Sequence, residues 1–174
     1  KLFGCVVVAP SPLPVSIISF ILNRENSDHD RQQVIDAVSQ FLVLRNPEQT
    51  LTFLHNLVPA WLTNDTKAPH KLLICKKMAG KYLREVFVEI LSSIIQESSS
   101  PCKSIDVKLK DYVMRVAVSF LCQFGGKDWL ELVFTCLTNY HFMERRLLSG
   151  KIEIYHLLQD LKLVRGCLDV DDKK

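Results

Sequence analysis

The stretch FLCQFGGKDWLELVFTCL, which runs from Phe120 to Leu137, decides whether the chain is interpreted as an enzyme or as a stack of helices. Its glycine-glycine-lysine at 125–127 matches the end of a phosphate-binding loop. A Walker loop, however, follows a strand, carries a serine or threonine after the lysine, and begins with a glycine. Here Asp128 follows the lysine, and Leu121 stands where the first glycine is required. The stretch is therefore predicted to be a corner between two buried helices and not a nucleotide site.

Each residue of this corner has a structural role in that interpretation. Gly125 supplies the left-handed conformation that commonly ends a helix, and Gly126 permits a sharp change of direction. Asp128 is suited to cap the following helix. The apolar residues that return to the core are Trp129, Leu132, Val133 and Cys136.

The segment before the corner, Asp106 to Phe124, is predicted to be the central helix. Its apolar residues point to most sides of a helix, which is typical of a helix surrounded by others. They are Val113, Met114, Val116, Val118, Phe120, Leu121 and Phe124.

Helix start signals recur along the rest of the chain. A cap residue followed by proline occurs at Ser11-Pro12 and at Asn46-Pro47, and after the second of these Leu51, Leu54, Leu57, Val58 and Trp61 line one helix face. From periodicity and such signals we expect helices over 12–23, 28–45, 47–62, 69–97, 106–124, 128–140 and 152–164. A strand competes with a helix at Val6–Val8 and over 86–95. The second of these segments lacks the alternation of a strand.

These expectations define an all-α fold of about seven helices in antiparallel pairs. The pattern is similar to irregular helical repeats of the HEAT or armadillo type, or to an orthogonal bundle, and it carries no specific motif. The 174 residues predict a single domain over 1–174, with an internal break at 98–103 and a frayed tail at 169–174. Because the first residue is Lys1, we expect a domain excised from a longer protein.

Composition narrows the class of protein. Hydrophobic residues make up 48% and charged residues 24% of the chain, as in a globular domain, and no apolar run is long enough for a membrane span. Several of the 6 cysteines lie in apolar helical segments. We therefore expect reduced thiols and an intracellular location, with the nucleus preferred over the cytoplasm. A secreted, disulfide-bonded helical cytokine is a remaining alternative.

Catalytic and metal-binding patterns are missing from the sequence. No Cys-x-x-Cys or His-x-x-x-His spacing occurs, and the 5 histidines are scattered. The carboxylates, Asp160 among them, occur singly at positions typical of a solvated helix face. We therefore predict no enzyme activity, no cofactor, no metal and no catalytic residue.

Two surface features have weaker functional interpretations. Lys77, Lys81 and Arg84 form a basic stripe at helical spacing with Lys76 close by, which would suit a nucleic-acid-binding domain. The net charge of only +3 favours a solvated face instead. Ser100, in Ser-Pro-Cys-Lys, is a candidate phosphorylation site that would place charge at the start of the next helix.

By elimination, the sequence predicts a non-enzymatic scaffold domain of a multiprotein complex. Stacked helices of this kind usually present a groove or ridge to another protein, such as a peptide or helical domain of a complex subunit. Large aromatic side chains dominate the energetics of such contacts. The candidate contact residues are Trp61, Trp129, Tyr140, Phe142 and Tyr155.

Overall fold

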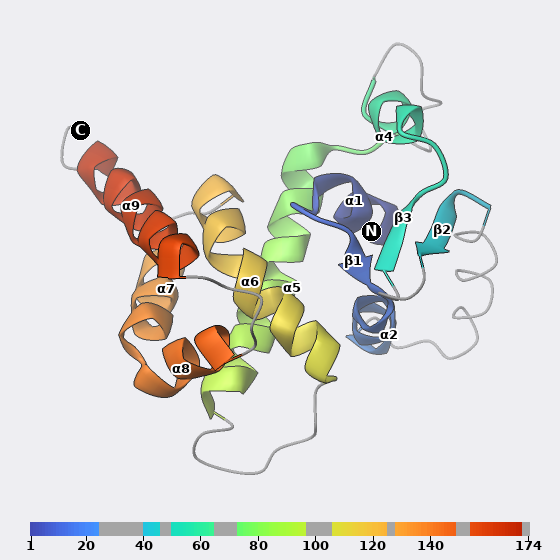
Figure 1. Ribbon diagram of the computed structural model, residues 1–174. Coiled ribbons are helices and arrows are strands. Elements are labelled where there is room, and N and C mark those ends of the chain that lie inside the picture. The colour runs from blue at the N-terminus through green and yellow to red at the C-terminus, as the bar shows by residue number, and fades with distance from the viewer. Residues whose placement is uncertain are drawn as a thin grey trace. The chain divides into compact units, whose positions relative to one another are not determined.

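The computed structural model describes residues 1–24, 40–45, 50–64, 73–96, 106–124, 128–148 and 154–171 (Figure 1). These residues form a mostly helical fold with a small three-stranded sheet. The predicted all-α class is confirmed in this broad sense, and the sheet is an addition that the sequence analysis did not foresee. Within the described ranges no helix combines the length and apolar character needed to span a bilayer.

The chain divides into two compact units, residues 1–83 and 84–174. The division falls within one helix, α5 (Lys76–Gln96). The break expected at 98–103 lies outside the described residues.

The first unit combines helices with the sheet. Its elements are α1 (Leu2–Val8), β1 (Leu13–Pro14), α2 (Val15–Arg24), β2 (Leu42–Arg45), β3 (Thr50–Phe53), α4 (Leu57–Leu62) and the start of α5 (Lys76–Gln96). The strand order is β1-β3-β2, and both pairings are antiparallel. In the register, Leu51 lies opposite both Leu13 and Leu44.

The sheet corrects two predicted helices. The end of the helix expected over 28–45 and the start of the one expected over 47–62 are strands, and the helical part begins only at Leu57. Residues 25–39 and 46–49 lie outside the described part of the chain. The segments carry β-branched residues such as Val43 and Thr52, which favour a pleated surface. Each strand is too short for its sequence periodicity to distinguish it from a helix, so its strand conformation is determined by the pairing with the neighbouring strand.

The N-terminal segments differ from expectation in their boundaries. The helix expected to begin at Pro12 begins at Val15, because Leu13 and Pro14 pair with β3. The Val6–Val8 segment belongs to α1 and not to a strand. Gly4 of α1 is buried close to α5, where an added Cβ would lie 2.9 Å from the Ala79 Cβ. A side chain at Gly4 would therefore push α1 away from α5.

The second unit is helical throughout its described residues. It contains the rest of α5, α6 (Val107–Phe124), α7 (Asp128–Thr138), α8 (Tyr140–Leu148) and α9 (Ile154–Asp171). The 86–95 segment is part of α5, so the helical interpretation is confirmed there. In the core Phe87 packs edge-on against Tyr112 and Phe120, with ring centroids 6.1 and 5.1 Å apart.

Helix α6 is the central helix that the sequence predicts. The Asp106 carboxylate accepts a hydrogen bond of 3.1 Å from the Leu109 amide and so caps the helix. Nine of its 18 residues are buried, among them Val113, Val118 and Leu121. The helix ends at Phe124 and α7 begins at Asp128, which are the boundaries that the sequence predicts, and the predicted corner at 125–127 lies outside the described residues.

Two helix boundaries in this unit were predicted wrongly. The helix expected over 128–140 ends at Thr138, and the Asn139 side chain accepts a hydrogen bond of 3.0 Å from the Phe142 amide and starts α8, a helix that the sequence did not predict. The last helix does not end at Val164 but continues to Asp171, which includes the first residues of the predicted tail.

Candidate functional site

Helix α9 has an inner and an outer apolar face. Its inner face packs against α6 and buries Leu157, Asp160 and Val164, with Cys167 half-buried in the next turn. Its outer face exposes a second row of aliphatic side chains at intervals of four, three and seven residues, which places them along one line of the helix. This outer stripe consists of Ile154, Leu158, Leu161 and Leu168, which are 68%, 52%, 48% and 47% exposed.

Polar and aromatic side chains lie beside the outer stripe on α9. Tyr155 is exposed, and its hydroxyl accepts a hydrogen bond of 2.7 Å from the Gln159 amide group, which holds the ring along the helix. Lys162 and Arg165 are the exposed cations of the same helix. The outer surface of α9 therefore offers an apolar line with positive charge beside it.

Other helices of the second unit also expose large apolar residues. Phe134 of α7, Tyr140 and Leu148 of α8 are each more than half exposed. Folded domains bury such side chains unless a partner covers them or they stand singly. The second unit thus exposes apolar side chains on three consecutive helices.

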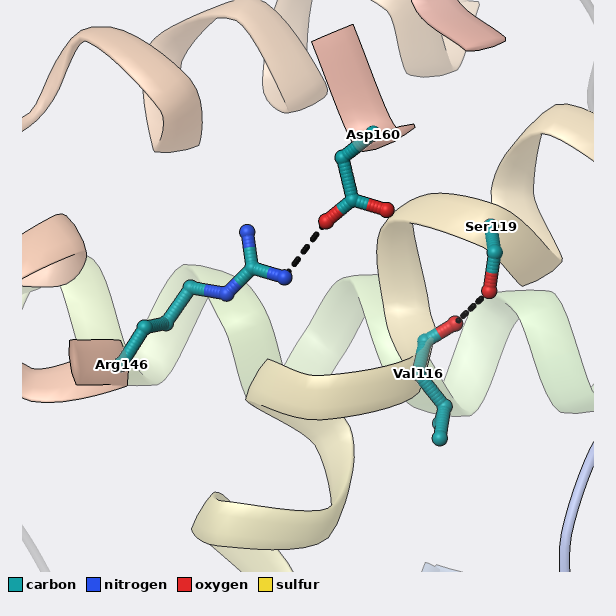
Figure 2. A network of polar contacts seen from close by, with 4 residues as sticks. All are labelled: Val116, Ser119, Arg146 and Asp160. Atoms are coloured by element: carbon teal, nitrogen blue, oxygen red, sulfur yellow. Dashed lines mark hydrogen bonds and ion pairs between the residues drawn. The ribbon is translucent and has the colours of Figure 1, made fainter. Parts of the chain in front are cut away.

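A buried ion pair fixes α9 to α8 (Figure 2). The Arg146 guanidinium, 1% exposed, donates a hydrogen bond of 2.5 Å to the Asp160 carboxylate, which is 6% exposed. The guanidinium also lies over the Phe142 ring, 5.8 Å from its centroid. Asp160 was predicted to lie on a solvated face, and that prediction is wrong because a cation from α8 neutralises it inside the unit.

Burial changes the pKa of the Asp160 carboxyl group more than the neighbouring cations do. Desolvation raises the pKa of Asp160 above its ordinary value, and the hydrogen bond and charge of Arg146 and the charge of His156 lower it only in part. The pair therefore positions α9 at a desolvation cost, as buried ion pairs often do.

Three cysteines lie in the helices of the second unit, on α6, α7 and α9. Cys122 of α6 and Cys167 of α9 are half-buried, and Cys136 of α7 is buried. Burial, and then the charge and hydrogen bond of Cys167, raise the pKa of Cys122 to about 12. Burial raises the pKa of Cys136 to about 11. Both thiols are thus protonated near neutral pH, and none of the five described cysteines is in a disulfide.

The structure separates the predicted contact residues into buried and accessible ones. Trp129 and Phe142 are 6% and 3% exposed and belong to the core of the second unit. Tyr140 and Tyr155 are accessible at 72% and 60%. Trp61 is half-buried in the first unit.

Trp61 lines a shallow groove of about 470 Å³ on α4. The lining residues are His55, Leu57, Val58, Ala60, Trp61 and Asn64. The His55 ring nitrogen accepts a hydrogen bond of 3.1 Å from the Leu57 amide, so the histidine fixes the start of α4. No acid or second imidazole lines the groove among the residues described there.

The predicted basic stripe lies in α5. Lys76, Lys77 and Lys81 are exposed, whereas Arg84 is half-buried and donates a hydrogen bond of 3.5 Å to the Phe124 carbonyl. Arg84 therefore helps to end α6. Ser100 lies outside the described residues, as does Cys102.

The described ranges contain no group of three or more His, Cys, Asp or Glu side chains placed to hold a metal ion. The outer stripe of α9 was missed in the sequence because a line of leucines at helical spacing has the same pattern whether it faces the core or the solvent. The sequence does contain one indication of the stripe. Apolar residues lie along two lines of α9, whereas packing one side of a helix against a core requires only one line. Comparisons with protein-family models, with curated proteins and with solved structures found no match to this chain.

Proposed function

We propose that the chain is a non-enzymatic protein-interaction module that docks an amphipathic helix of a partner protein onto the outer stripe of α9. The observation that supports this most directly is the exposure of Ile154, Leu158, Leu161 and Leu168 along one line of an 18-residue helix. Helices that dock in this way use apolar anchors at spacings of three, four and seven residues.

The energetics of the stripe favour a covered state. Full burial of an aliphatic side chain contributes about 1.5–3 kcal/mol, so covering the half-exposed residues of the stripe recovers on the order of 1 kcal/mol each. Exposed Tyr155 extends the same surface and supplies an aromatic anchor of the kind that dominates interfaces. The inner face is already occupied by α6, so the outer stripe is available to a partner.

Charge defines the partner further. Lys162 and Arg165 give the exposed surface of α9 a positive character. A partner helix with an apolar stripe flanked by Asp or Glu complements this surface, and its association rate should fall as the salt concentration rises. We place this interaction in an intracellular, nuclear complex, a location for which the support comes from the sequence alone.

A photocrosslinking experiment tests the proposal. A benzoylphenylalanine placed at Leu161 is compared with one at Leu54, which is 68% exposed in the first unit and serves as the matched control. The segment crosslinked at Leu161 is identified by mass spectrometry, synthesised as a peptide and titrated against the protein. An acidic, amphipathic helical peptide whose binding weakens about tenfold or more in Leu158→Asp supports the proposal. Equal crosslinking at Leu161 and Leu54 contradicts the proposal, and so does a peptide affinity that Leu158→Asp leaves unchanged.

A nucleic-acid-binding role is the second candidate, favoured by the exposure of Lys76, Lys77 and Lys81 on one helix. It predicts binding to a duplex or single-stranded oligonucleotide at low salt that weakens steeply as salt rises. Lys77→Glu/Lys81→Glu should abolish that binding. If the unaltered protein binds neither oligonucleotide at low salt, this role is excluded.

A further inference from the structure

The first unit carries the net positive charge of the chain. Residues 1–83 contain 9 Lys and Arg and 6 Asp and Glu, whereas residues 84–174 contain 13 of each, so the whole net charge of +3 belongs to the first unit. All acidic residues of this unit lie in 25–39, 46–49 and 65–72, outside the described ranges. Such a charge difference between two parts of a chain is typical of proteins that bind polyanions.

Two cations of the first unit lie over one aromatic ring. The Lys1 Nζ atom is 5.3 Å and the Arg24 guanidinium carbon is 5.7 Å from the centroid of the Tyr82 ring. At such distances a cation is attracted to the negative face of the ring. Tyr82 of α5 thereby brings together the residue that precedes α1 and the last residue of α2.

The exposed side of α5 beside this ring adds two lysines and a methionine. Lys77 and Lys81 are four residues apart, as are Met78 and Tyr82, so the two pairs form neighbouring rows on the helix. Met78 is 64% exposed and lies between the lysine row and the ring. Glu85, one turn beyond Lys81, is half-buried. The Tyr82 surface, as we name it, consists of Lys1, Arg24, Lys77, Met78, Lys81 and Tyr82.

We propose that the Tyr82 surface binds the surface of an anionic lipid bilayer. Its four cations pair with anionic headgroups, and Met78 enters the boundary between the headgroups and the acyl chains. Clusters of Lys and Arg on an amphipathic helix recognise anionic lipids in this way, and an apolar side chain among them adds buried area. The inference concerns the first unit and is independent of what binds the outer stripe of α9.

Met78 favours a bilayer over a nucleic acid as the ligand. Nucleic acids are held mainly by cations that contact phosphates and by aromatic rings on which bases stack. Met78 contributes to neither, and two cations already lie over the Tyr82 ring. A bilayer interface, in contrast, buries an apolar side chain and pairs the cations around it. Lys77 and Lys81 are thus assigned anionic lipids as their ligand in place of a nucleic acid.

Co-sedimentation with vesicles tests the inference. The protein is mixed with vesicles of phosphatidylcholine and phosphatidylserine, or with vesicles of phosphatidylcholine alone. We expect the protein to sediment with the mixed vesicles, less so as the salt concentration rises, and not with phosphatidylcholine alone. Equal binding to both kinds of vesicle overturns the inference. So does a protein that binds an oligonucleotide but not the mixed vesicles at the same low salt concentration.

Charge variants locate the binding surface. Lys77→Gln and Lys81→Gln should each weaken binding to the mixed vesicles by about fivefold, the contribution expected of one cation near an anionic bilayer. Arg45→Gln removes an exposed cation from β2, outside the Tyr82 surface, and should weaken the binding by less than about twofold. An equal loss in Arg45→Gln and Lys81→Gln contradicts the assignment, because it would reflect only the total charge of the unit.

Met78→Gln tests the insertion of an apolar side chain. It should weaken vesicle binding by about fivefold, since the bilayer no longer buries the methionine. Leu54→Gln, at a side chain that is 68% exposed and outside the Tyr82 surface, serves as the matched control and should bind normally. Because the substituted side chains are exposed, each variant should keep the melting temperature of the unaltered protein. Vesicle binding that Met78→Gln leaves unchanged overturns the inference.

Discussion

Helices α6 and α9 have the same length, 18 residues, and use their apolar side chains in opposite ways. Nine residues of α6 are buried, and they lie on most sides of the helix. In α9 the buried residues among the described side chains, Leu157, Asp160 and Val164, lie on one side of the helix. Four aliphatic residues form the outer stripe. A similar apolar content thus builds a core in one helix and an accessible surface in the other.

The largest expected effect comes from a charge placed in α6. Val118 is 1% exposed, and Val118→Asp buries a carboxylate without a partner, which costs several kcal/mol of a total stability of about 5–15 kcal/mol. We expect the second unit to unfold, seen as fast amide exchange throughout 107–124. Unchanged exchange protection in this variant would mean that α6 is not the central helix.

A somewhat smaller effect is expected where α8 and α9 meet. Arg146→Met leaves the Asp160 carboxylate buried without its guanidinium and should lower the free energy of unfolding by about 3–5 kcal/mol. Replacing both residues, as Arg146→Met/Asp160→Leu, removes the uncompensated charge and should restore most of the loss. Denaturant titration of the single and double variants measures the coupling, and additive losses would contradict a direct pair.

Alkaline pH tests the burial of Cys136, which is 1% exposed. The ordinary thiol pKa is 9.0 and burial raises that of Cys136 to about 11. Between these values the unfolded chain loses the proton while the native state keeps it, so stability falls as pH rises from 9 to 11. The decrease is at most about 1.4 kcal/mol per pH unit. Cys136→Ala should show a smaller slope in denaturation measured across this range, and an equal slope would place Cys136 in solvent.

The smallest effect on stability is expected at the outer stripe. Leu158→Asp and Leu161→Asp replace side chains that are about half exposed, so each should change the free energy of unfolding by no more than about 0.5 kcal/mol. Thermal denaturation of these variants and of Val118→Asp compares the stability contributed by the exposed side of α9 with that contributed by α6. A loss comparable to that of Val118→Asp would assign the stripe to the core.

The sequence was sufficient for the parts of the fold that local signals specify. The buried character of α6, its start near Asp106 and its end at Phe124 all follow from residues close together in the chain. The strands β1, β2 and β3 depend on pairing between distant segments, as in the register of Leu13 with Leu51, which no local pattern contains.

The candidate site was harder to predict for the same reason. Periodicity shows that Leu158 and Leu161 share a face but not whether another helix covers it. The Arg146–Asp160 pair joins residues from two helices, one of which, α8, the sequence did not predict.

The affinity of the peptide crosslinked at Leu161, measured by fluorescence anisotropy, tests the role of α9 most directly. We expect Leu161→Asp to keep the melting temperature of the unaltered protein and to bind the peptide at least about tenfold more weakly, while Leu54→Asp binds normally. Undiminished binding to a folded Leu161→Asp variant would contradict the assignment of the outer stripe as a docking surface.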